Sequence, residues 1–169
     1  MPPAARMVGR LAAVLSATEG DDVPEPLGFV PGIFDLFHVG DLDLLAHARS
    51  RCCGLVAAVA TDRLVEEVWG RTPFVPEAER IEIVAHMRPV DHVVPLDTLD
   101  LAHVLPRDVH VFVGGHLLGE DRPPRVEQLL DGVVARGVAV TEVDDLRTSA
   151  SRVLLAALGV CEQGRRSVA

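Results

Sequence analysis

The sequence is poor in cysteine, has no excess of basic side chains and lacks any long apolar run. Its formal net charge of −9 argues against non-specific binding to nucleic acid, because that binding depends on basic side chains that displace counterions. The three cysteines show neither a disulfide framework nor zinc-ligand spacing, which is typical of a reducing compartment. No segment approaches the roughly 20 apolar residues that span a bilayer, and the first residues contain no apolar run of signal-peptide length. We therefore expect a cytoplasmic protein whose partners include neither nucleic acid nor a membrane.

Apolar residues are plentiful enough for one globular domain, at 49 % of 169 residues. Apolar runs of strand length alternate with segments of helical periodicity. This alternation predicts an α/β fold, a Rossmann-like parallel sheet of about five strands with helices on both faces. Residues 1–26 are predicted to form a helix (about 4–18) and a linker, followed by a domain over 27–169. The predicted strands cover 27–30, 54–61, 90–95, 108–115 and 138–143, and the predicted helices cover 38–50, 77–87, 96–105, 125–137 and 149–159.

One stretch, FVPGIFDLFHVGDLDLL (29–45), has the character of a phosphate-binding turn that leads into a helix. His38 and Gly40 stand where the first strand passes into its helix, and a helix start offers N–H groups and partial positive charge to anions. Residue 41 lies three positions after His38, so both side chains can face one ligand. Ligands of parallel sheets bind at the carboxyl ends of the strands. The segments expected around this crevice are 32–40, 61–70, 114–119 and 144–151.

Four blocks of the sequence, in order from about residue 27 to 158, resemble the cytidylyltransferases of glycerol 3-phosphate and ethanolamine phosphate. PGIFDLFHVG resembles their signature G-x-F-D-x-x-H-x-G-H, and residues 60–95 resemble a block with T-D, K-G-R-x-P, E-R and R-x-V-D. DVHVFVGG takes the place of a strand that ends in G-D-D-W, and LRTSASRVL resembles a shortened R-T-x-G-x-S-T-T. The resemblance implies a nucleotidyltransferase fold and a homodimer. It also implies transfer of CMP from CTP to a phosphorylated small alcohol, with release of pyrophosphate and with Mg²⁺ as a possible cofactor.

The candidate site residues occupy these motif positions or lie beside them along the predicted crevice. Those expected to be catalytic are His38, Asp41 and His116. Those expected to bind ligand are Gly32, Phe34, Asp35, Gly40, Asp62, Trp69, Arg71, Arg80, Arg88, Gly114, Arg147, Ser149 and Ser151.

The sequence departs from the family pattern at positions that carry chemistry. Asp41 replaces the second motif histidine, Trp69 replaces the lysine of K-G-R, and His116 lies where the family has D-D-W. A carboxylate about 4 Å from a phosphate oxygen costs on the order of 4 kcal/mol at an effective dielectric of 20. Losing one preorganised donor typically lowers turnover about 10²- to 10³-fold. Asp41 could instead stabilise the first turn of the helix, hold Mg²⁺ or receive a cationic group.

Three hypotheses remain open from the sequence. The first is a cytidylyltransferase-like enzyme with weakened or altered phosphate handling. The second is a repurposed enzyme that needs no nucleotide and uses Asp41 or His116 as an acid–base group. The third is a non-catalytic protein that binds a ligand in the same crevice.

Overall fold

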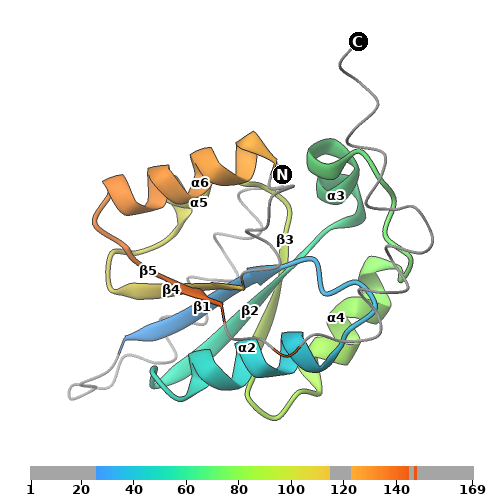
Figure 1. Cartoon of the computed structure of the whole chain (residues 1–169), viewed down its shortest axis with the longest axis horizontal. Coiled ribbons are helices and arrows are strands. Elements are labelled where there is room, and N and C mark those ends of the chain that lie inside the picture. The colour runs from blue at the N-terminus through green and yellow to red at the C-terminus, as the bar shows by residue number, and fades with distance from the viewer. Residues whose placement is uncertain (1–25, 115–122, 145–146, 148–169) are drawn as a thin grey trace.

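The computed structural model of the chain describes residues 26–114, 123–144 and 147. Within them, five parallel strands form one sheet in the order β3-β2-β1-β4-β5 (Figure 1). The strands are β1 (Leu27–Gly32), β2 (Gly54–Ala60), β3 (His92–Leu96), β4 (Val109–Gly114) and β5 (Ala139–Val143). The helices are α2 (Val39–Arg49), α3 (Asp62–Trp69), α4 (Glu77–Ala85), α5 (Leu101–Val104) and α6 (Pro124–Ala135). The helices predicted over 4–18 and 149–159 lie outside the described residues.

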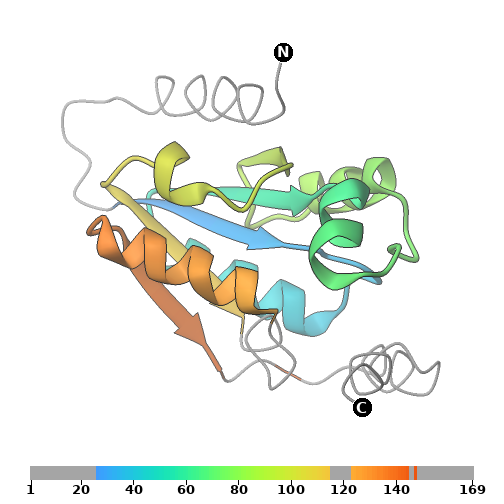
Figure 2. The ribbon, with the colours of Figure 1, turned by 90° about the horizontal axis from the view of Figure 1, so that it is seen from above.

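Helices cover both faces of the sheet, as the sequence predicted. One apolar cluster joins α2 and α4 to one face, and another joins α3, α5 and α6 to the other face (Figure 1). Strands β1 and β2 are buried along their whole length because they lie between these two layers. Figure 2 shows the arrowheads of the strands at one end of the sheet, which is the end that parallel α/β folds use for ligands.

Helix α3 was not assigned from the sequence, and α5 is shorter than predicted. Thr61 caps α3, because its Oγ1 accepts a hydrogen bond from the Leu64 N–H at 3.2 Å. Gly70 ends the helix in the left-handed region at φ 66°. The predicted helix over 96–105 is reduced to the four residues of α5: Leu96 ends β3, an edge strand that tolerates Pro95, and residues 97–100 are neither helix nor strand.

The sheet opens between β1 and β4 at its carboxyl end. Strand β1 pairs with β2 over all six of its residues but with β4 over only the first three, Leu27 to Phe29. This is also where the strand order reverses direction, with β2 and β3 on one side of β1 and β4 and β5 on the other. Open α/β sheets bind ligands at such switch points. The carboxyl ends of β1 and β4, called the crevice below, are therefore the expected position of a ligand site.

Candidate functional site

His38 and Asp41 form a reciprocal cap at the start of α2. The Nδ1 atom of His38 accepts hydrogen bonds from the N–H groups of Gly40 at 3.1 Å and Asp41 at 3.3 Å. In return, Asp41 Oδ2 accepts a hydrogen bond from the His38 N–H at 2.9 Å. This is a capping box in which aspartate takes the place usually held by glutamate or glutamine. The carboxylate also lies at the positive end of the helix dipole.

The cap reduces the number of backbone N–H groups that the start of α2 can donate to a ligand. The N–H groups of Gly40 and Asp41, which the sequence pattern assigned to an anion, donate to the His38 ring instead. Because Nδ1 acts as an acceptor, the neutral imidazole carries its proton on Nε2. The Nε2–H group is then the hydrogen-bond donor of the His38 side chain.

Arg147 lies against the first turn of α2. A Cβ atom at Gly40 would lie 2.9 Å from the Arg147 carbonyl oxygen, so the close approach requires glycine at this position. The Arg147 guanidinium forms a two-point ion pair with Asp43, with Nε–Oδ2 at 2.8 Å and Nη2–Oδ1 at 2.6 Å. The hydrogen bond from Arg147 lowers the pKa of Asp43, and the same contact raises the pKa of Arg147. Thus Arg147 lies at the start of α2, where it is held by a carboxylate that the sequence reasoning did not select.

Asp35 organises the loop between α3 and α4. Its carboxylate accepts hydrogen bonds from the N–H groups of Phe74 and Val75, both at 3.0 Å, and from Arg71 Nη1 at 3.0 Å. The Asp35 side chain is 3 % exposed. The two predicted ligand-binding residues Asp35 and Arg71 therefore bind each other.

The backbone on either side of Asp35 is strained. Phe34 and Leu36 have φ angles of 54° and 52°, in the left-handed region that non-glycine residues rarely occupy. A Cβ atom at Gly32 would lie 2.7 Å from the Phe34 ring, so this ring folds back over the end of β1. Such strain is concentrated at functional sites because the surrounding contacts must hold it in place.

Arg80 is fully buried and ties the carboxyl ends of β1 and β2 together. Its Nη1 donates to the carbonyl oxygens of Ile33 at 2.6 Å and Ala60 at 2.8 Å. Its Nε donates to the Val75 carbonyl at 2.8 Å, and its Nη2 pairs with Asp62 Oδ1 at 2.5 Å. Arg80 and Asp62, both predicted to bind ligand, therefore serve here as supports for the crevice.

The remaining candidates are placed less centrally. Trp69 is the last residue of α3 and packs half-buried against the core. Arg88 is exposed and precedes β3, so it lies at the amino edge of the sheet and is not brought to the crevice. Gly114 ends β4 at the carboxyl edge. Outside the described residues lie His116, Ser149 and Ser151.

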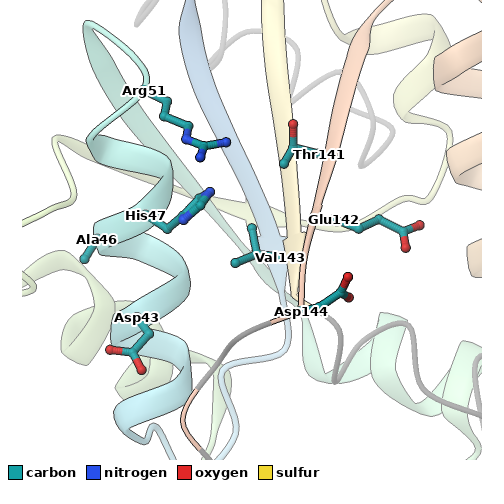
Figure 3. Close-up of a pocket in the computed structure, with 8 residues that line it drawn as sticks. All are labelled: Asp43, Ala46, His47, Arg51, Thr141, Glu142, Val143 and Asp144. Carbon is teal, nitrogen blue, oxygen red and sulfur yellow. The ribbon is translucent and has the colours of Figure 1, made fainter.

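A pocket of about 490 Å³ lies between α2 and β5, and none of the sequence candidates lines it (Figure 3). Three of its residues, Asp43, His47 and Arg51, recur at intervals of four along and just beyond α2, a signal that the sequence reasoning passed over. The complete lining, which we call the α2–β5 pocket, is Asp43, Ala46, His47, Arg51, Thr141, Glu142, Val143 and Asp144.

Comparison with known proteins agrees with this architecture. A sequence model of the family described as "Cytidylyltransferase-like" matches residues 29–156, which is most of the chain. The chain belongs to the cytidylyltransferase-like family. It is 36 % identical over 110 residues to the bifunctional protein HldE of Acidiphilium cryptum, covering 63 % of this chain and 23 % of that protein. It is 42 % identical over 69 residues to HldE of Granulibacter bethesdensis, covering 40 % of this chain and 14 % of that protein. The chain thus spans less than a quarter of these curated relatives.

Solved structures share the fold of this family member at low sequence identity. A lipopolysaccharide core biosynthesis protein from Thermoplasma volcanium matches with a TM-score of 0.55 and 20 % identity, over 73 % of this chain and 98 % of that one. Pantothenate synthetase from Thermus thermophilus matches with a TM-score of 0.51 and 18 % identity, over 92 % and 68 %. The predicted family and the nucleotidyltransferase-type fold are confirmed. Among the described residues, no helix is both long and apolar enough to cross a membrane.

Proposed function

We propose that the protein binds a nucleoside triphosphate in the crevice between β1 and β4 and transfers its nucleotidyl group to a phosphorylated small alcohol. The motif blocks support CTP as the donor, because they resemble those of cytidylyltransferases. The observation that carries the proposal is the position of His38, which caps α2 where the sheet opens beside β1. A homodimer and a cytoplasmic location stay predictions, and light scattering of the purified protein tests the first.

The reaction needs positioning and charge stabilisation more than covalent chemistry. A phosphate oxygen of the alcohol attacks the α-phosphorus, the bond to the bridging oxygen breaks, and pyrophosphate leaves with the electron pair. His38 contributes its Nε2–H to the phosphate charge, while Asp35 and Arg80 hold the crevice walls in place. Mg²⁺ would reduce the charge of the triphosphate. Among residues 26–114, 123–144 and 147, no three His, Cys, Asp or Glu side chains form a cluster that could hold a metal ion.

The chain lacks two groups on which the family mechanism relies. All 16 residues counted as lysine or arginine are arginines, so no other part of this chain can supply the missing lysine. The second motif histidine is Asp41, whose carboxylate is engaged in the cap of α2. If each group contributes the usual 10²- to 10³-fold, turnover is several orders of magnitude below that of a complete family site.

A substitution at His38 can separate its two roles. Asparagine is a good N-cap, so His38→Asn keeps an acceptor for the first N–H groups of α2 and removes the imidazole donor. We expect His38→Asn to melt close to the parent protein and to lose CTP-dependent pyrophosphate release. Arg125→Gln, on the exposed side of α6, is the matched control. Unchanged pyrophosphate release in His38→Asn would overturn the role assigned to His38. If the parent protein releases no pyrophosphate with any of a broad panel of phosphorylated alcohols, the transfer reaction is overturned.

The second candidate function is nucleotide binding without turnover. The lack of lysine and of the second histidine favours it, since both departures weaken charge stabilisation in the transition state. A thermal-shift titration with CTP, CDP, CMP and ATP separates the two functions when it is combined with the pyrophosphate assay. A ligand at 100 times its Kd adds about 2.7 kcal/mol of stability. Such a shift without pyrophosphate release would select the binding protein over the enzyme.

A further inference from the structure

We propose that the α2–β5 pocket is a second ligand site, which binds the phosphate group of a small phosphorylated molecule through His47 and Arg51. This site is separate from the β1–β4 crevice, and the inference goes beyond the nucleotidyl transfer proposed above.

The pocket exists because α2 does not extend over the edge of the sheet. Helix α2 packs on β1, β2 and β4, and β5 lies beyond them as an edge strand. The side chains of His47 and Arg51 project from α2 and the residues just after it toward the strands, into the pocket between α2 and β5, as Figure 3 shows. A volume of about 490 Å³ is in the range of sites that hold small organic molecules rather than single ions.

The two side chains on the α2 side of the pocket have hydrogen-bonding capacity that the described residues do not use. His47 Nε2 is buried without a hydrogen-bond partner in that part of the chain. The Arg51 guanidinium forms no hydrogen bond or ion pair with any residue in the described ranges. A buried polar atom without a partner is unfavourable, so a ligand that supplies an acceptor to His47 is stabilised by that contact. The planar guanidinium of arginine suits an oxyanion such as phosphate, to which it can donate two hydrogen bonds.

The carboxylates in the lining do not neutralise the end of the pocket that His47 and Arg51 form. Asp43 is neutralised by its two-point pair with Arg147. Glu142 and Asp144 extend from β5 away from His47 and Arg51 in Figure 3. The acidic end of the pocket suits hydroxyl groups of the ligand, which can donate to Asp144, while its phosphate lies at the other end.

Two histidines will report whether the pocket is occupied. Burial, and then the charge of Arg51, lowers the pKa of both His47 and His110. His110 lies on β4, where its Nε2 contacts Thr141 Oγ1 at 2.8 Å and its ring stacks on Phe112. A bound phosphate would offset the Arg51 charge and favour the protonated imidazoles. Binding should therefore raise the pKa of His47 and, more weakly, that of His110.

The test uses the full chain and follows the histidine ring resonances by NMR. Inorganic phosphate and ribose 5-phosphate are titrated to about 10 mM, ten times a Kd of about 1 mM, against chloride at matched ionic strength. We expect saturable shifts of the His47 and His110 resonances that chloride does not produce, and a higher pKa of His47 in the bound state. Arg51→Gln should weaken the affinity about tenfold or more. The control Arg125→Gln removes the same charge from α6, on the other face of the sheet, and should bind as the parent does.

Each contrary result has a definite meaning. No saturable shift, an equal response to chloride, or full binding in Arg51→Gln would overturn the phosphate site. The thermal shift with CTP, measured in the same variants, keeps this inference distinct from the proposed function. Loss of phosphate binding with the CTP response retained supports a separate site, whereas loss of both would show one shared site and overturn the inference as stated.

Discussion

His38 and Asp41 exchange hydrogen bonds across the first turn of α2, with the imidazole Nδ1 accepting from the Asp41 N–H at 3.3 Å and the carboxylate accepting from the His38 N–H at 2.9 Å. A carboxylate at a phosphate-binding turn is unfavourable when it faces the ligand, but in this protein it is bound to the backbone of the turn. Asp41 thus has a structural role, the capping of α2, that does not depend on which ligand the protein binds.

Removing the Asp41 side chain should destabilise the fold. Asp41→Ala leaves the His38 N–H without its acceptor, and we expect a loss of about 1 kcal/mol in the free energy of unfolding, the usual contribution of a helix cap. Asp41→Asn keeps an oxygen acceptor and should retain most of the stability. Urea denaturation of the three proteins measures both values. Equal stability of Asp41→Ala and the parent would show that the cap contributes nothing.

Restoring the family residues should increase turnover. The double substitution Asp41→His with Trp69→Lys supplies both missing groups, and we expect pyrophosphate release from CTP to rise by on the order of 10²-fold or more. Thermal melting must accompany the assay, because the cap and the half-buried Trp69 packing are both lost. Adding His38→Asn to the double variant is the control and should abolish the gain. A folded double variant with no gain would argue against a nucleotidyl-transfer site at this crevice.

Arg80 should be the most sensitive arginine of the described residues. Arg80→Leu leaves the buried carbonyls of Ile33 and Ala60 unpaired, and each unpaired group costs about 1–3 kcal/mol. We expect a loss of about 3 kcal/mol or more in the free energy of unfolding. Arg88→Leu, at an exposed position, is the matched control and should stay within about 0.5 kcal/mol of the parent. If both variants unfold at the same denaturant concentration, the buried network does not stabilise the fold.

The Asp43–Arg147 pair should make stability depend on pH in the acid range. The pKa of Asp43 is lowered from 3.8 in the folded protein, so the unfolded chain binds this proton at a higher pH than the native protein does. The pair therefore contributes stability above that pH, and the contribution is lost as the pH falls through the folded pKa. Asp43→Asn should unfold with a weaker dependence on pH below about 4. Urea denaturation at neutral pH and near pH 3 measures the difference, and identical acid dependence in the two proteins would contradict it.

The alternation of strands and helices could be read from the sequence because burial imposes a local period on it. The run GLVAAVA is apolar throughout because β2 is covered on both faces, and the motif around His38 lies at the end of a strand in any parallel α/β arrangement. The same local reasoning passed over α3, where a capping threonine and a terminal glycine were the available signals. It also extended α5 too far: Leu96 belongs to β3 through its pairing with Ala60, and residues 97–100 are neither helix nor strand.

The partners of the site residues were decided by the tertiary structure. Asp35 binds the backbone of Val75, Arg80 binds the backbone of Ile33, and Arg147 contacts Gly40 and Asp43 across more than a hundred residues of chain. No periodicity or spacing encodes such contacts, because they depend on strand order and on how far each helix extends across the sheet. The sequence by itself determined the family and the α/β class. Only the folded arrangement decided that several motif residues bind one another and that α2 leaves a pocket beside β5, since the free energy of a polar side chain depends on the partners that folding brings within hydrogen-bonding distance.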